Sequence, residues 1–502
     1  MSNHSLHARA AGVLVCCAGL ALGAAAATAG STFTWGSATS GDWTLATNWN
    51  PNSGPPNGAA DSAVINATGS SYTVTMNLSP ALLDLTLDSI DATLAMGSGR
   101  ILNIGGLAWI RNGTLTMNSS TVTGAGTLRN DASIVAESSP TIGAMFEQNG
   151  TLTIRGRTGV NTTLTITPSF TNNGLIDIAS IQAATSSNLR VDGTLSNAAG
   201  GELRVGVGSG GARSLRMFAM ENFGTVQIDR TVTLGDASGL GGAYTNMGVW
   251  NLAAGTITTM AGAGLSFTQS GGNLDAQGAF ELSNGDFNFD GGTVTGGGVR
   301  LTNATLNIGA GSTGAGSVVM RGTSSNLSGD LAAAQTLTVR GETGLNTTVT
   351  AAAPFSNAGL IELTTLGAPT SAALHADGGL TNTGEVRIGE GAGGARTLRA
   401  LTMVNDGLVS VDWSLDLTPF GGAGAFTNNA QWNIAAGRTL SMSSASESFT
   451  HAAGNLNVLG AFEVSNGDFN FDGGTVTGGA PRLTNGTLNI GAGSAGEASF
   501  VM

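Results

Sequence analysis

The sequence predicts an all-β fold of the solenoid type, a parallel β-helix in which each coil of the chain stacks on the one before. Residues 283–297 read SNGDFNFDGGTVTGG, and residues 465–479 repeat the same fifteen letters 182 positions later. Within this stretch apolar residues alternate with Asp, Asn and Thr around a Gly-Gly turn, which is the period of β-strands. A unit that recurs at a fixed long interval is typical of stacked repeats rather than of a globular enzyme core.

A shorter period lies within the long one. Asparagines followed by a glycine and an alternating strand recur every 23 to 25 residues, which is the length that one coil with strands of about 4–6 residues needs. In each module one strand face is apolar, for example Ile176 with Ile178, or Val226 with Ile228. We expect these faces to line a continuous core and the asparagines to form amide ladders at the bends. The recurring asparagines are Asn172, Asn197, Asn222, Asn246, Asn357, Asn382, Asn405 and Asn428.

Composition agrees with an extended β structure. The 502 residues include 79 glycines, only 10% charged and 5% aromatic residues, and an apolar fraction of 41% that is too high for a disordered chain. The chain contains no lysine, which excludes a P-loop and a Schiff-base lysine. Its formal net charge of −13 disfavours nucleic acid and anionic membranes as partners.

Residues 1–29 have the pattern of a secretory signal peptide. Basic residues up to Arg9 precede an apolar, alanine-rich run, and small residues precede Gly30. The run is too short for us to prefer a membrane span. Both cysteines, Cys16 and Cys17, lie inside this segment, so the mature chain would contain no thiol or disulfide. We expect export through this signal, an extracellular or outer-membrane-associated location, and no membrane insertion by the mature chain.

Residues 30–93 are expected to form a tryptophan-rich cap with the first strands. Trp35, Trp43 and Trp49 lie within fifteen residues of one another. As a cap, these indoles would cover the open first rung of the stack, whose free edge would otherwise invite aggregation. As a carbohydrate platform, the same indole faces would stack on sugar rings. We favour the cap and keep glycan contact by the three tryptophans as an alternative.

A resemblance supports this division of the chain. The W–GxW–NW–PP–DxAVI arrangement in residues 33–65 resembles the opening segment of large bacterial surface proteins built from autotransporter-associated β-strand repeats. The remaining residues share only Gly/Asn/Thr-rich strand repeats with that group. The resemblance implies a right-handed parallel β-helix that is displayed or secreted as a passenger and takes part in adhesion to glycans, host surfaces or other cells.

Residues 94–502 are expected to form the β-helix itself, with long internal units at 112–283, 284–465 and 466–502. Matched segments support these boundaries, for example WNLAAG at 250–255 with WNIAAG at 432–437. The third unit stops at Met502, opposite Met320 of the second. We therefore expect the sequence to be a fragment of a longer reading frame.

Candidate chemistry is sparse. Two acidic rows, one in each copy of the repeated stretch, project from the same side of a strand and offer the oxygen ligands that Ca²⁺ prefers, although a solvated outer face is the favoured interpretation. The rows contain Asp286, Asn288 and Asp290, and again Asp468, Asn470 and Asp472. The mature chain has two histidines, His375 and His451, which are far apart and replace Arg190 and Gln269 of the preceding unit. A histidine-centred triad or zinc site is therefore disfavoured.

We predict that the chain is a non-enzymatic passenger that projects or presents surface, with no catalytic residues and no required cofactor. Duplication counts against catalysis, because an active site is usually singular whereas structural features are copied with the repeat. One alternative is a β-helical polysaccharide lyase or hydrolase that uses carboxylates and an arginine on one outer face. Another is a carbohydrate-binding cell-wall component. Two pairs of arginines recur with the long unit, Arg155 with Arg340 and Arg213 with Arg396. Salt bridges between rungs explain them as well as ligand contacts would.

Overall fold

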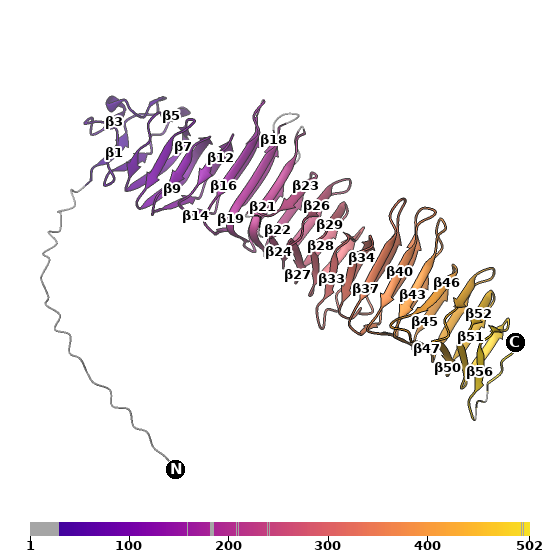
Figure 1. Ribbon diagram of the computed structural model, residues 1–502. Helices are drawn as coiled ribbons and strands as arrows, with labels where there is room; N and C mark the ends of the chain where they lie inside the picture. Colours follow the sequence, from indigo (N-terminus) through magenta and orange to yellow (C-terminus); the bar gives the residue numbers. More distant parts are fainter. Residues whose placement is uncertain are drawn as a thin grey trace, which may run out of the picture.

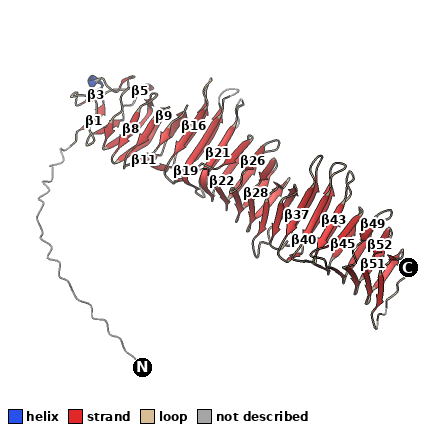
Figure 2. Ribbon diagram, viewed as in Figure 1, coloured by secondary structure: helices blue, strands red, loops and turns tan. Residues whose placement is uncertain are grey.

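The chain forms one elongated parallel β-solenoid of about 18 turns (Figures 1 and 2). The computed structural model describes residues 30–502 except 158, 181–184, 207, 209, 238, 240, 493 and 495. The predicted signal peptide lies outside the described residues. Nearly all strand pairs are parallel and join consecutive turns. No helix among the described residues has the length and hydropathy needed to cross a membrane. The predicted fold class is confirmed.

Each regular turn contributes one strand to each of three faces, A, B and C. In one turn β24 (Ala243–Asn246) lies on face A, β25 (Val249–Leu252) on face B and β26 (Ile257–Ala261) on face C. These strands pair in register with β27 (Ser266–Gln269), β28 (Asn273–Ala276) and β29 (Ala279–Ser283) of the next turn. Short runs of alternating residues, separated by turn residues, therefore fold as predicted.

The first structural unit runs to β35, past the predicted boundary at residue 283, and its other strands follow the same order. Before it come β4 (Ser62–Ile65), β5 (Tyr72–Met76), β6 (Ala81–Leu82), β7 (Asp84–Met96), β8 (Ile101–Ile104) and β9 (Leu107–Asn118). Face A contains β11 (Thr127–Asn130), β14 (Met145–Gln148), β17 (Phe170–Asn172), the second halves of β19 (Ser187–Asn197) and β21 (Arg213–Asn222), then β24, β27, β30 (Asp286–Phe289), β33 (Thr305–Ile308) and β35 (Ser325–Ser328). Face B contains β12 (Ser133–Glu137), β15 (Thr151–Gly156), β18 (Leu175–Ser180), β20 (Glu202–Val205), β22 (Thr225–Ile228), β25, β28 and β31 (Thr293–Gly296). Face C contains β10 (Thr121–Thr123), β13 (Thr141–Ile142), β16 (Thr162–Ile166), the first halves of β19 and β21, then β23 (Val232–Gly235), β26, β29 and β32 (Val299–Thr302).

The second structural unit runs from β36 to β56, past the predicted boundary at residue 465, and repeats the three faces. Face A contains β38 (Phe355–Asn357), β41 (Leu380–Asn382), β44 (Thr402–Asn405), β47 (Gly424–Asn428), β50 (Glu447–His451), β53 (Asp468–Phe471) and β56 (Thr487–Ile490). Face B contains β36 (Gln335–Gly341), β39 (Leu360–Thr365), β42 (Glu385–Ile388), β45 (Leu408–Val411), β48 (Gln431–Ile434), β51 (Asn455–Val458) and β54 (Thr475–Gly478). Face C contains β37 (Thr347–Ala351), β40 (Ala372–Ala376), β43 (Arg396–Ala400), β46 (Leu415–Pro419), β49 (Thr439–Met442), β52 (Ala461–Ser465) and β55 (Arg482–Thr484).

The two units join by a shift of faces that the sequence did not predict. At the junction β34 (Gly316–Arg321) pairs with β32 of face C on one side and with β36 of face B on the other. Face A of the first unit likewise passes from β35 to β37, which lies on face C of the second unit. The second face A therefore begins anew and forms a separate seven-stranded sheet, β38 to β56.

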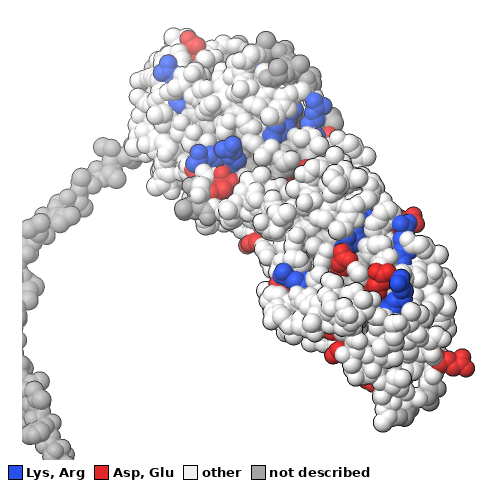
Figure 3. Space-filling view, turned by 45° about the vertical axis from the view of Figure 1, so that its right-hand side comes forward, with Lys and Arg blue, Asp and Glu red and all other residues white. Residues whose placement is uncertain are grey.

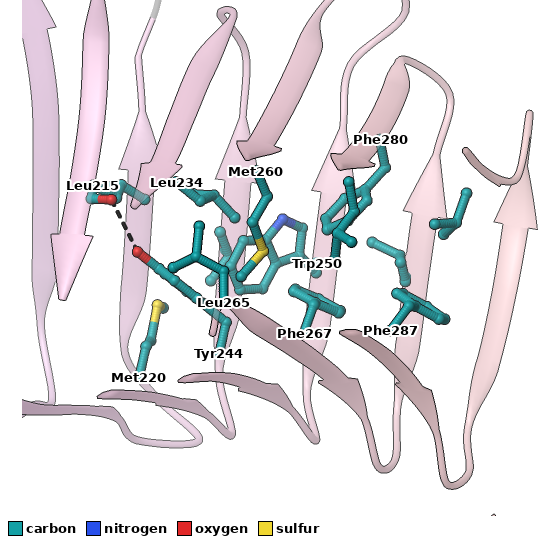
Figure 4. Packing of buried hydrophobic residues seen from close by; sticks show 14 of the residues in the cluster. Leu215, Met220, Leu234, Tyr244, Trp250, Met260, Leu265, Phe267, Phe280 and Phe287 are labelled. Atoms are coloured by element: carbon teal, nitrogen blue, oxygen red, sulfur yellow. Dashed lines mark hydrogen bonds between the residues drawn. The ribbon is translucent and has the colours of Figure 1, made fainter. Parts of the chain in front are cut away.

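Inward side chains form a continuous apolar column. Ile176, Val226 and Val386 are fully buried, so the predicted inward faces are confirmed. In the middle of the rod Trp250, Phe267, Phe280 and Phe287 pack edge-to-face or in parallel, with ring centroids 4.8–6.3 Å apart (Figure 4). Burial of each large apolar side chain contributes roughly 1.5–3 kcal/mol. Because every turn shares its core with both neighbours, stability is distributed along the stack.

The asparagines form two buried amide ladders on face A. In the first unit Asn172, Asn197, Asn222 and Asn246 are joined in sequence by side-chain hydrogen bonds of 2.7 Å. In the second unit Asn357, Asn382, Asn405 and Asn428 repeat the same bonds at 2.7 Å. All eight side chains are fully buried. The predicted ladders are therefore confirmed, and buried polar atoms are satisfied along the bend.

A glycine follows every ladder asparagine except Asn428, where Ala430 stands in its place, and close approach between turns accounts for this preference. A Cβ at Gly384 would lie 2.2 Å from the carbonyl oxygen of Gly359, and one at Gly407 would lie 2.3 Å from that of Gly384. Both distances are far shorter than van der Waals contact. The Asn-x-Gly module therefore places an amide inside the bend and leaves room for the next turn outside it.

The tryptophan-rich segment closes the N-terminal end of the stack. β1 (Thr32–Trp35) pairs in parallel with β4, while β3 (Trp49–Asn50) pairs with the other edge of β1 in the antiparallel direction. β2 (Gly41–Asp42) pairs with β5, and the short 3₁₀ helix η1 (Ala46–Asn48) leads into β3. An antiparallel strand on the outer edge of β1 blocks further parallel addition. This arrangement is that of a cap.

Candidate binding groove on face C of the first unit

A groove lies over face C of the first unit. It has a volume of about 500 Å³ and lies over β16, β19, β21 and β23. Its lining contains three arginines, five hydroxyl or amide side chains and no carboxylate. On a chain with a formal net charge of −13, such a lining is unusual. On the face shown in Figure 3, charged side chains gather in small groups separated by wide uncharged surface.

Strand register places the polar side chains of the groove in two rows. Thr163, Asn188, Ser214 and Thr233 occupy paired positions on four consecutive strands and form a neutral row. Hydrogen bonds join Asn188 to Thr163 at 3.2 Å and Ser214 to Asn188 at 2.8 Å. Adjacent rungs are about 4.8 Å apart. The neutral row therefore presents donors and acceptors at regular intervals along the rod.

The second row contains two arginines side by side. Arg190 pairs with Arg216 on the neighbouring strand, and both side chains are exposed. Arg190 Nε donates to Asp192 at 2.7 Å, whereas Arg216 has no ion-pair partner among the described residues. Like charges on directly paired strand positions destabilise a sheet. The row therefore holds positive charge that its surroundings only partly neutralise.

A buried arginine adds positive charge beneath the groove. Arg213 is only 1% exposed, and its Nη1 donates to the carbonyl oxygens of Gly210 and Gly211 at 2.9 and 3.0 Å. Among the residues that the structure describes, its Nε and Nη2 have no hydrogen-bond partner. Burial, together with the charge of Arg230, lowers the pKa of Arg213 from its ordinary value. Neither Arg213 nor its counterpart Arg396 forms an ion pair with a described residue, so the salt-bridge interpretation fails for these two arginines. It holds for Arg155, which pairs with Glu137 of the preceding turn at 2.7 Å.

The second unit contains the same face with its charges neutralised. His375 replaces Arg190, and burial together with the charge of Arg399 lowers its pKa, which favours the neutral imidazole. Arg399, at the position of Arg216, forms two hydrogen bonds to Asp377 at 2.8 and 2.6 Å. Its guanidinium also lies over the ring of Phe420, 5.3 Å from the centroid. The two copies have thus diverged at the positions that carry charge.

The buried arginines have different neighbours in the two units. Arg396, the copy of Arg213, lies 5.2 Å from the ring centroid of Trp413. The corresponding position of the first unit is Arg230, whose charge acts on Arg213. An aromatic ring attracts a guanidinium, whereas a second guanidinium repels it. Arg438 also lies over Trp413, 4.1 Å from the ring centroid, and its charge acts on Arg396. The two units therefore differ in charge at the positions of Arg190 and Arg216 rather than at the buried arginine.

The three tryptophans predicted as possible glycan contacts are interior residues. Trp35, Trp43 and Trp49 are 2%, 0% and 2% exposed. Trp49 packs edge-on against the other two, at centroid distances of 5.0 and 4.7 Å. The indole nitrogens of Trp43 and Trp49 donate to the carbonyl oxygens of Pro56 and Trp43. In this arrangement no indole face is open to a sugar ring, and the segment serves the cap.

The predicted acidic rows lie on the outer side of face A. Asp286 and Asp290 are exposed, as is Asp472, and Asp468 is half-exposed. Between them Asn288 bonds to Thr268 and Asn307, and Asn470 bonds to Thr450 and Asn489. The described residues contain no group of three or more His, Cys, Asp or Glu side chains placed to hold a metal ion. The calcium prediction gains no support from this geometry.

No family model, curated protein or solved structure matches this chain. The site must therefore be judged from its own residues. Sequence reasoning did not single out Asn188, Arg190, Ser214 and Arg216 as a group. Their only common signal is a spacing of one coil, 26 residues for both Asn188 to Ser214 and Arg190 to Arg216, which becomes informative once the register is known.

Proposed function

We propose that the chain is a non-enzymatic, extracellular passenger of a bacterial cell surface, related in role to autotransporter-type adhesins, and that it displays binding surface along a stiff rod. The observation that supports the proposal is a difference between the inward and outward sides of the strands. Inward residues and amide ladders repeat from unit to unit, whereas outward residues of face C have diverged. A scaffold that varies its surface on a constant core is suited to recognition.

Export and surface location follow from residues outside the described structure. The basic start, apolar run and small residues before Gly30 favour a signal peptide. A right-handed coil is our expectation, because β-crossover-β connections are almost always right-handed. Glycans or other cell-surface molecules are the proposed partners, since the groove is polar and lined by hydroxyl, amide and guanidinium groups.

Adhesion is tested by coating beads with the purified chain and measuring their retention on glycan-bearing cells. The matched control is beads coated with the chain after denaturation. We expect retention that depends on the folded rod. Equal retention of both bead preparations would contradict the proposal.

Catalysis is tested separately, by incubating the chain with a panel of acidic polysaccharides and following the release of unsaturated sugars. We expect no release above the buffer control. Sustained release that scales with protein concentration would instead favour a polysaccharide lyase.

A further inference from the structure

The face C groove of the first unit contains more positive charge than the fold requires. Arg190 and Arg216 lie on paired strand positions, and Arg213 lies buried at the start of the same strand as Arg216. The copy in the second unit shows that the fold tolerates His375 in place of Arg190 and an ion pair at Arg399. The excess charge of the first unit is therefore a local feature rather than a structural necessity.

We infer that this groove binds an acidic glycan, with Arg216 and Arg190 contacting its carboxylate or sulfate groups and the neutral row contacting its hydroxyls. This inference rests on the proposed function and names the ligand class of its binding surface. Guanidinium groups form bidentate hydrogen bonds with carboxylates and similar oxyanions. An anion bound between Arg190 and Arg216 would reduce the repulsion between their two positive charges. No carboxylate of the described residues forms an ion pair with Arg216.

The neutral row favours a sugar chain over other polyanions. Thr163, Asn188, Ser214 and Thr233 run parallel to the arginine row along the groove. They offer hydroxyl and amide groups that suit sugar hydroxyls. The groove lining contains no aromatic side chain, whereas proteins that bind single-stranded nucleic acids stack bases on aromatic rings. The overall acidic charge of the chain also opposes a long nucleic acid.

The buried arginine acts on the groove through its charge. Arg213 Nε and Nη2 are enclosed and unpaired, so their field is screened less by water than that of an exposed side chain. Asp192 offsets part of the charge of Arg190. Three arginines and no carboxylate line the groove, and Arg216 is the one of the two exposed arginines that forms no ion pair with a described residue.

The experiment measures the affinity of the full purified chain for three immobilised probes, namely polygalacturonate, heparin and neutral dextran. We expect the chain to bind at least one acidic probe and not dextran, with an affinity that falls as salt increases. Arg216→Ala should weaken binding about tenfold or more, which corresponds to the loss of one charge-assisted contact. Arg399→Ala changes the same position of the second unit and should leave the affinity within about twofold. The carboxylated and sulfated probes distinguish the two possible sources of the anion.

Two further variants test the binding of an acidic glycan in this groove. Arg216→Lys should retain part of the binding, because the charge stays while the bidentate geometry is lost. Replacing His375 by Arg and Asp377 by Asn in one chain should create a second site and raise the binding stoichiometry. Failure to bind either acidic glycan, equal loss in Arg216→Ala and Arg399→Ala, equal binding of dextran, or tighter binding of a single-stranded oligonucleotide would each overturn the inference. Release of sugars from a bound probe would overturn the non-enzymatic proposal while leaving the groove assignment in place.

Discussion

The side-chain amide of Asn428 donates a hydrogen bond to Nδ1 of His451 at 3.1 Å, so that a histidine ends the second amide ladder. The other ring nitrogen, Nε2, carries the proton and donates to the carbonyl oxygen of Thr475 at 3.0 Å. In the first ladder the corresponding residue is Gln269, which accepts from Asn246 at 2.9 Å. The second ladder therefore ends in a residue that can titrate, whereas the first ladder ends in a glutamine, which cannot.

This relationship predicts a pH-dependent stability. Burial lowers the pKa of His451 below its ordinary value, whereas the unfolded chain titrates near pH 6.5. Below about pH 6.5 the unfolded state binds more protons, so stability is fully present above this pH and falls as the pH decreases toward the lower folded pKa. Each unit of pKa difference corresponds to about 1.4 kcal/mol.

The measurement compares the wild-type chain with His451→Gln by chemical denaturation between pH 7.5 and pH 5. We expect the variant, which copies Gln269, to lose less stability on acidification. Burial raises the pKa of Glu447 on the same strand, which acts in the opposite direction, but it does so equally in both proteins. Identical pH profiles for the two proteins would show that His451 does not titrate as described.

Removing an internal ladder residue should destabilise the rod locally. Asn382 accepts from Asn357 and donates to Asn405, both at 2.7 Å, and all three are fully buried. Asn382→Ala leaves buried polar groups unpaired and should cost about 1–3 kcal/mol. Asn429→Ala, which removes only an exposed bond to Asp406, should change stability by less than about 0.5 kcal/mol. Hydrogen exchange of β41, β44 and β47 reports the difference, and equal protection in the two variants would contradict the ladder's role.

The glycines of this column should tolerate a side chain poorly where turns approach closely, although Ala430 occupies one position of the column. Gly384→Ala places a Cβ 2.2 Å from the carbonyl oxygen of Gly359 and should destabilise the chain by roughly 1–3 kcal/mol. A Cβ at Gly200 meets nothing within 4 Å, so Gly200→Ala should be neutral or slightly stabilising. Thermal unfolding of the two variants tests this contrast. A Gly384→Ala protein as stable as Gly200→Ala would mean that the turns are not stacked as described.

The cap tryptophans should matter for stability rather than for sugar binding. Trp43 is fully buried, and Trp43→Ala should cost about 3–5 kcal/mol in the N-terminal turns. Leu45, which is 53% exposed, supplies the control variant Leu45→Ala. We expect faster hydrogen exchange in β1 and β4 of the Trp43 variant, with β53 unchanged. If glycan retention were lost while exchange in β1 stayed slow, the platform interpretation would be favoured instead.

The sequence alone predicts the coil but not the groove. Core residues such as Val226 and ladder residues such as Asn222 belong to a pattern that fits within one coil and recurs from coil to coil. The alternation of apolar residues and the turn residues in a short stretch of sequence are therefore enough to predict them. Arg190 and Arg216 become neighbours only through the pairing of strands one turn apart. The rows of the groove depend on that register, which no single window of the sequence contains.

The junction and the buried arginines escaped prediction for related reasons. The shift of faces at β34 depends on which strand of the next turn pairs with β34. No residue pattern in β34 predicts that this partner is β36. The recurrence of Arg213 in both long units fits a salt bridge and a ligand contact equally well, and it does not predict burial. In the structure the Nη1 of Arg213 is satisfied by the loop carbonyl oxygens of Gly210 and Gly211, which composition cannot reveal.

The register of the stacked turns is the claim on which the core, the ladders and the groove all depend, and engineered disulfides test it most directly. One column on three consecutive turns contains Val404, Thr427 and Thr450. The only native cysteines are Cys16 and Cys17, and these two residues are treated identically, either kept or replaced by serine, in the two double-cysteine variants compared. Cα atoms on adjacent rungs, about 4.8 Å apart, suit a disulfide, whereas those two rungs apart exceed its limit of about 7 Å. We predict that Thr427→Cys with Thr450→Cys forms an intramolecular disulfide on mild oxidation and that Val404→Cys with Thr450→Cys does not. Cross-linking of the second pair in place of the first would contradict the account.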